Sequence, residues 1–134
     1  MLWLRKSKKG FTLIELMVVV AIIGVLALLG LRVYSGQQAK AKEAIVKANA
    51  GTVQTLIQSE LADKMITRDD AATVALQANL HDPFGGTAMD AVTWFPLAAD
   101  APGEIQITLD ASSIFHVQGY GATKLIPEEL TARR

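Results

Sequence analysis

Cysteine is absent from this sequence of 134 residues, and histidine occurs only twice. Without cysteine the chain has no disulfide framework, no thiolate zinc site and no thiol nucleophile. No serine-nucleophile motif and no glycine-rich phosphate loop accompany the histidines, His81 and His116. We therefore predict no catalytic residues, no metal site and no cofactor, and we interpret His81 as a polar loop residue.

Acidic residues are absent from the first ten positions, which carry Arg5, Lys6, Lys8 and Lys9. The whole chain is formally neutral, with 13 basic and 13 acidic residues, so nine bases remain against 13 acids once those four are set aside. Tight binding to nucleic acid depends on neutralising phosphates with basic side chains. The mildly acidic body therefore argues against direct nucleic-acid binding.

Apolar residues make up 51% of the sequence, and the run of 21 residues from Phe11 to Leu31 has a single charge, Glu15. As a helix this run spans about 31 Å, close to the hydrocarbon thickness of a bilayer. A secretory signal peptide has a shorter run that ends at a small-residue cleavage site, whereas here Gly10 precedes the run. A single-pass anchor fits the length and the basic flank. It leaves Glu15 unexplained, because a carboxylate within a membrane is costly.

A third interpretation accounts for both Gly10 and Glu15. The stretch KKGFTLIE at residues 8–15, and the apolar run that continues to Gly24, resemble the processing site of the type IV pilin family, which includes the pseudopilins of type II secretion. The resemblance implies that a membrane peptidase cuts after Gly10 and methylates the new N-terminus, Phe11. Glu15 then becomes the fifth residue of the mature protein.

The chemistry of this stretch suits such processing. Glycine fits a tight protease groove because it has no side chain, and the basic residues before it attract anionic headgroups at the membrane surface. In the family, the residue matching Glu15 pairs with the terminal amine of an adjacent subunit and sets the axial register, which would neutralise a buried charge. The alternative is an intrachain effect, in which an acid in the first turn complements the helix dipole.

Small residues recur at every third position of the apolar run, at Ala21, Gly24, Ala27 and Gly30. Such a row lets another helix backbone come close within lipid, so we expect helix packing there. The alternative is composition alone, since alanine and glycine are common in membrane helices.

The chain divides by pattern into four parts: a cleaved leader at 1–10, a filament-core helix at 11–31, an amphipathic continuation at 32–64 and a small head at 65–134. At Arg32, where many family members have a proline, this chain has none, and no strong breaker follows. The continuation should place an apolar stripe on the head. Its members are Ile45, Ala48, Thr52, Val53, Leu56 and Ile57.

The head is expected to begin with a short helix, because Thr67 and Asp70 have the spacing of a capping box; the helix would end near Asn79. Residues 92–97, 104–109 and 114–118 are predicted strands, the last two forming a hairpin. The predicted fold class is α+β, with a long N-terminal helix packed on a small antiparallel sheet, as in pilins.

The loop Asp82-Pro83-Phe84-Gly85 faintly resembles a turn of major pseudopilins, some of which bind calcium later in the chain. The same residues are also favourable turn formers, which is the interpretation we prefer.

The resemblance predicts a structural filament subunit and no enzyme. As a precursor it would be a single-pass protein of the cytoplasmic membrane; once processed, it would form a homopolymer at the cell surface. Its partners would be the prepilin peptidase, an assembly ATPase and a platform protein. Family roles include adhesion, twitching motility, DNA uptake and electron transport. Two alternatives remain open: a pseudopilin of a type II secretion system, and a membrane-anchored enzyme or binding protein.

Overall fold

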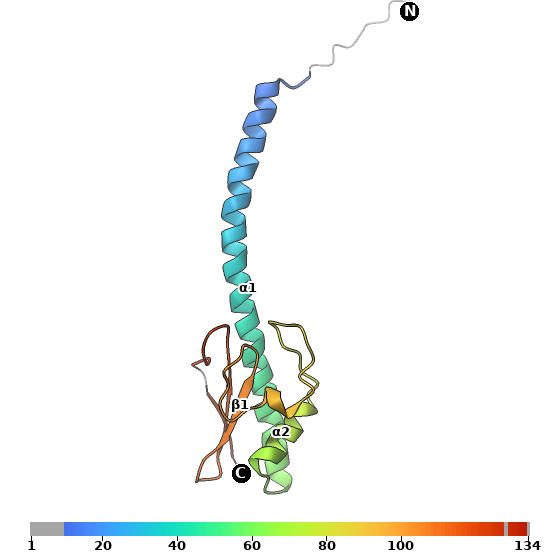
Figure 1. Ribbon diagram of the computed structural model, residues 1–134, viewed down its shortest axis with the longest axis vertical. Coiled ribbons are helices and arrows are strands. Elements are labelled where there is room, and N and C mark those ends of the chain that lie inside the picture. Colours follow the sequence, from blue (N-terminus) through green and yellow to red (C-terminus); the bar gives the residue numbers. More distant parts are fainter. Residues whose placement is uncertain (1–9, 128, 134) are drawn as a thin grey trace, which may run out of the picture. The chain divides into compact units, whose positions relative to one another are not determined.

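The computed structural model describes residues 10–127 and 129–133. The predicted leader therefore lies outside the described residues, except for Gly10. The fold contains the predicted long N-terminal helix and small antiparallel sheet, so the α+β class is confirmed (Figure 1). Its elements are α1 (Leu13–Asp63), α2 (Arg68–Leu76), a 3₁₀ helix η1 (Val92–Trp94), β1 (Ile105–Leu109), β2 (Phe115–Gly119) and β3 (Leu130–Ala132).

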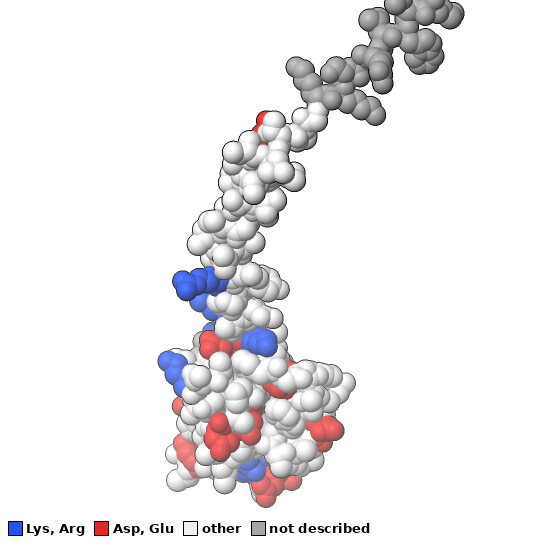
Figure 2. Space-filling view, turned by 45° about the horizontal axis from the view of Figure 1, so that its top comes forward, with Lys and Arg blue, Asp and Glu red and all other residues white. Residues whose placement is uncertain are grey.

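The chain forms two compact units that divide between Gln37 and Gln38. In the described part of the first unit the only charged residues are Glu15 and Arg32, so the helix surface between them is uncharged (Figure 2). In the described chain α1 is also the one helix long and apolar enough to cross a membrane, by length and composition. It is continuous through Gly24, although glycine weakens a helix by about 1 kcal/mol relative to alanine.

The second unit has a core built on one face of α1. The predicted stripe was right at Val53 and Ile57, which are fully buried, but wrong at Ile45, Ala48 and Thr52, which are exposed. The buried face lies about one residue further along, because that phase includes aliphatic residues over four turns. Its members are Val46, Ala50, Val53, Ile57 and Leu61.

The sheet has the order β1-β2-β3, and both pairings are antiparallel. The predicted hairpin is confirmed, with Ile107 of β1 opposite Val117 of β2. Side chains alternate between the two faces of a strand, and the inward positions pack on the core face of α1. These are Ile105, Ile107, Phe115 and Val117, all buried.

The predicted strand at 92–97 is wrong, because Val92–Trp94 forms the 3₁₀ helix η1. Pro96 has no amide hydrogen to donate to a sheet. The backbone carbonyls of this segment accept hydrogen bonds from outside a strand ladder. The Arg68 guanidinium donates to the Phe95 carbonyl, and the Ile107 amide donates to the Pro96 carbonyl at 3.0 Å. This short segment therefore covers the outer edge of β1 without extending the sheet.

Strand β3 was not predicted, and side chains of α1 hold its outer edge. Gln54 Nε2 donates to the Thr131 carbonyl at 2.7 Å. Gln58 exchanges two hydrogen bonds with the Arg133 backbone, at 2.5 and 3.1 Å. Three residues are too few to give a periodic signal, so this strand is defined by its partners and not by its own sequence.

The predicted capping box at the start of α2 is confirmed. The Thr67 hydroxyl accepts from the Asp70 amide at 3.2 Å, and the Asp70 carboxylate accepts from the Thr67 amide at 2.9 Å. The hydrogen bonds from the Thr67 amide and hydroxyl lower the pKa of Asp70. The helix ends at Leu76, three residues before the predicted end at Asn79, which has a left-handed φ of 48°.

The loop at 81–86 is a turn organised by Asp82, whose side chain is only 4% exposed. Its carboxylate accepts from the Phe84 amide at 2.9 Å and from the Gly85 amide. These bonds match the turn chemistry expected of the sequence. The carboxylate also lies against Gly103, whose φ is 93°, and a Cβ added there would lie 2.8 Å from Cγ of Asp82.

This contact gives a prediction with a built-in control. Gly103→Ala and Gly86→Ala both place alanine at a positive φ, which costs about 1–2 kcal/mol, but a Cβ at Gly86 meets open space. Gly103→Ala should destabilise the protein by about 1–3 kcal/mol more, because Asp82 must give up buried hydrogen bonds. Thermal unfolding in detergent micelles, followed by near-ultraviolet circular dichroism, measures both. Equal losses of stability in the two variants would show that the contact between residue 103 and Asp82 does not affect stability.

Candidate assembly site

The start of α1 is closed by a capping box between Thr12 and Glu15. The Thr12 amide and hydroxyl both donate to Glu15 Oε2, at 2.8 and 2.7 Å, and the Glu15 amide donates to the Thr12 hydroxyl at 3.3 Å. The first helical hydrogen bond follows, from the Leu16 amide to the Thr12 carbonyl at 3.2 Å. The box satisfies two amides that a helix N-terminus otherwise leaves without partners.

Thr12 is a site residue that our sequence analysis missed. The signal was present, since Thr12 and Glu15 have the same threonine-to-acid spacing that identified Thr67 and Asp70. The structure thus gives Glu15 an intrachain role, the alternative considered above. The capping box holds the Glu15 carboxylate at the positive end of the helix dipole, where a negative charge is favourable.

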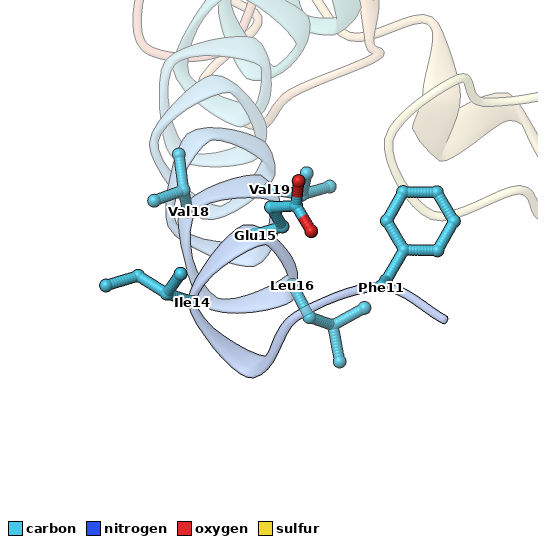
Figure 3. A pocket seen from close by; sticks show the side chains of 6 residues that line it. All are labelled: Phe11, Ile14, Glu15, Leu16, Val18 and Val19. Carbon is cyan, nitrogen blue, oxygen red and sulfur yellow. The ribbon is translucent and has the colours of Figure 1, made fainter. Parts of the chain in front are cut away.

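An apolar surface surrounds this carboxylate. Glu15 lies beside an open hollow of about 560 Å³ whose other lining residues are all apolar. In Figure 3, Ile14 and Val18 form one row along the helix, and Glu15 and Val19 form the next. The lining residues are Phe11, Ile14, Glu15, Leu16, Val18 and Val19.

Apolar side chains remain exposed along the whole of this segment. Phe11 is 90% exposed, and every large apolar side chain from there to Tyr34 is more than half exposed. Soluble monomers rarely present a continuous apolar surface of this size, and such a surface marks a membrane or protein contact. The segment is therefore built to be covered by lipid or by other protein.

The four small residues at 21–30 are exposed as well. A Cβ added to Gly24 or Gly30 would meet no atom within 4 Å in this chain. Because three residues fall about 60° short of a full helical turn, the row winds around the helix, and Ala21 and Gly30 face opposite sides. Packing along this row stays a prediction, and its geometry suits contacts with more than one neighbour.

The histidines occupy different settings in the second unit. His81 is exposed in its loop, where its carbonyl accepts from Asn49 Nδ2 at 3.2 Å. His116 on β2 contacts Glu129 and Asp110. We did not single out this cluster from the sequence, because Glu129 reaches it through the unpredicted strand β3. Among residues 10–127 and 129–133, no three His, Asp or Glu residues are grouped to hold a metal ion.

Comparison with known proteins also identifies the N-terminal segment. The family described as "Prokaryotic N-terminal methylation motif" matches residues 5–31. The fimbrial protein EcpB of Eikenella corrodens is 49% identical over 56 residues, which cover 42% of this chain and 35% of that protein. The type IV major fimbrial protein FimA of Dichelobacter nodosus is 29% identical over an alignment that covers 98% of this chain and 85% of that protein.

A third relative, the type IV major pilin protein PilA of Myxococcus xanthus (strain DK1622), is 43% identical over 58% of this chain and 35% of that protein. The chain spans little more than a third of the length of EcpB, and the same holds for its match to another FimA sequence of Dichelobacter nodosus. No solved structure matches the chain at the significance that these relatives reach. The match to the methylation motif and the relatives' fimbrial and pilin names, together with the apolar helix and the small antiparallel sheet, support a type IV pilin family for this chain.

Proposed function

We propose that this chain is the precursor of a structural subunit of a type IV pilus. A prepilin peptidase removes residues 1–10, and the new terminal amine of Phe11 is methylated. The subunit then leaves the cytoplasmic membrane and polymerises through the apolar start of α1, driven by an assembly ATPase and a platform protein, into a filament at the cell surface.

One observation carries this proposal: an exposed apolar helix with a single carboxylate, Glu15, at its capped N-terminus. A simple anchor explains the apolar surface but has no use for the carboxylate. In a filament the same surface is buried by neighbouring helices, which stabilises by about 25 cal/mol per Å² of apolar area. The carboxylate then lies where the amine of another subunit can meet it.

Removal of the leader also changes the electrostatics. Cutting after Gly10 takes away Arg5, Lys6, Lys8 and Lys9, which bind anionic headgroups. It creates one positive charge, on the Phe11 amine, next to an apolar surface. A buried charge left without a partner costs several kcal/mol, so pairing with Glu15 of an adjacent subunit would favour one axial register over others.

The capping box contributes to this pairing. Thr12 holds the Glu15 carboxylate through Oε2 and fixes its position at the helix start. Hydrogen bonds of this kind offset part of the cost of carrying a carboxylate in lipid before assembly. We therefore assign Thr12 as a positioning residue and Glu15 as the residue that contacts the neighbour.

The closest rival function is a pseudopilin of a type II secretion system. The relatives named above carry fimbrial and pilin names, which favours the pilus. Deleting the gene should remove filaments visible by electron microscopy and leave enzyme secretion unchanged. Loss of secretion with no change in surface filaments would favour the pseudopilin.

Mass spectrometry of the purified protein tests the processing step. The mature chain should begin at Phe11 and carry one additional methyl group. Gly10→Leu should leave the full-length precursor in the membrane, because the cleavage groove excludes a side chain. Gly36→Leu is the matched control: Gly36 lies in α1 with open space around it, and this variant should still be cut. A mature protein that retains Lys8 and Lys9 would contradict the proposal.

Three variants separate charge pairing from helix capping. Glu15→Gln keeps an oxygen that can accept from Thr12 but loses the charge, whereas Thr12→Val keeps the charge and loses the hydroxyl. Glu15→Gln and Glu15→Ala should be inserted and processed, yet yield few sheared filaments, while Thr12→Val should assemble better than either. Abundant filaments from Glu15→Gln, combined with loss of filaments in Thr12→Val, would assign Glu15 to capping alone.

A fragment that starts at Gln38 tests the rival interpretation of a membrane-anchored enzyme. Residues from Gln38 onward form a compact unit with its own core. The fragment should therefore be soluble and monomeric, with mixed helix and strand by circular dichroism, and should show no hydrolase or transferase activity in a broad substrate screen. Robust turnover by the fragment would revive the enzyme interpretation.

A further inference from the structure

A cluster of three ionisable side chains lies on the outer face of the sheet. His116, on β2, directs Nδ1 to Oε1 of Glu129, just before β3, and Nε2 to Oδ2 of Asp110, in the β1–β2 turn, at 3.5 Å. The imidazole therefore lies between two carboxylates from different parts of the chain. Its nitrogens point in opposite directions, so the cluster links two segments and does not converge on one point.

The chemistry of imidazole makes this arrangement depend on a proton. A neutral ring carries one N–H donor and one acceptor nitrogen, whereas an ionised carboxylate only accepts. A neutral His116 can donate to Glu129 or to Asp110, and its other nitrogen then faces a carboxylate lone pair. Only the protonated ring can donate to both.

We propose that His116 is a proton-operated latch that holds the C-terminal strand β3 on the sheet. With the ring protonated, Glu129 and the strand that follows are tied through His116 to the β1–β2 turn. When the ring loses its proton, one donor is left for two carboxylates and the attraction of the positive charge for Glu129 is lost, so the hold on β3 weakens. This device does not depend on the proposed filament function.

Strand β3 is short, so one additional link can change how firmly it is held on the sheet. It has three residues and pairs with β2 through Phe115↔Ala132, His116↔Thr131 and Val117↔Leu130. Its outer edge is held only by the side-chain amides of Gln54 and Gln58, in the described part of the chain. His116 therefore pairs with Thr131, the middle residue of β3.

The charge of His116 depends on the side chains that surround its ring. A polar hollow of about 230 Å³ opens over the ring, and the other described residues that line it from β1 and β2 are uncharged: Gln106, Thr108 and Gln118. Glu129 and Asp110 are therefore the charged groups that face His116 in the described chain. The Ser112 and Ile114 amides donate to Asp110 at 2.8 and 2.9 Å and keep it ionised.

The direction of the pH dependence follows from these contacts. The hydrogen bond to Glu129, followed by that to Asp110, raises the pKa of His116 above its usual value of 6.5. The Ile114 and Ser112 amides lower the pKa of Asp110. The contribution of His116 is fully present below about pH 6.5 and is lost as pH rises through the raised pKa. At the acid end it lasts until the carboxylates are protonated.

The two histidines allow a direct measurement. Full-length protein labelled with ¹³C and ¹⁵N on the histidine rings gives two sets of signals in detergent micelles, and the His116→Gln variant assigns them. Titration from pH 5 to pH 9 should give a His116 midpoint above about 6.5, lower in Glu129→Gln and in Asp110→Asn. A wild-type midpoint at or below that value, or one that neither variant moves, would overturn the latch.

Release of β3 is measured by carboxypeptidase trimming past Ala132, followed by mass spectrometry at pH 6 and pH 8.5. His116→Gln is the control, because glutamine can donate to Glu129 but does not titrate, so it corrects for the pH dependence of the protease itself. The trimming rate should rise with pH about twofold to fivefold more in the wild type than in His116→Gln, the range expected for one exposed ion pair. Equal rises in the two proteins would refute the proposal.

Discussion

The apolar surface at the start of α1 is the constraint on which the rest of the molecule depends. Seventeen large side chains from Phe11 to Tyr34 remain more than half exposed in the single chain. Exposure of an apolar surface of this extent to water is energetically unfavourable, so we expect lipid or other protein to cover it. Under the proposed function, the basic residues at 5–9, the lone carboxylate and the small residues at 21–30 would all serve to move one helix between these two environments.

The second unit differs from the first, since it is compact and has its own buried core. It buries one face of α1 under the sheet and α2, and it attaches the chain to that helix through side-chain amides: Asn49 to the loop at 81–86, and Gln54 and Gln58 to β3. Amides are suited to this task because they satisfy backbone groups without adding charge. Both edges of the sheet are covered: the β3 edge by these glutamines, and the β1 edge by the Pro96 carbonyl and Arg68. This cover removes an unwanted route to association through exposed strands.

Sequence predicted those features that rest on local chemistry. The capping box at Thr67, the β1–β2 hairpin and the apolar run all have short-range signals, and the structure contains each of them. The two errors that concern strands share a different cause. The segment at 92–97 has strand-like residues, but Pro96 and the contacts from Arg68 redirect it, and β3 has almost no signal of its own. Their conformations are set by partners far away in the sequence, which a local pattern does not contain.

The candidate site shows the same division between local and distant information. Thr12 and Glu15 use the chemistry that starts α2, so the cap at the N-terminus of α1 is local and needs no partner. A cap, however, requires only an acceptor, and glutamine serves as well as glutamate. At the start of α2 the acid is exposed to water, where its charge is inexpensive. At the start of α1 the acid is also exposed in the single chain, but its neighbours are apolar. The same charge becomes costly once lipid or protein covers this surface. Capping alone therefore does not account for a glutamate at position 15. The helix dipole favours its negative charge, and the proposed pairing with the Phe11 amine of an adjacent subunit would favour that charge further.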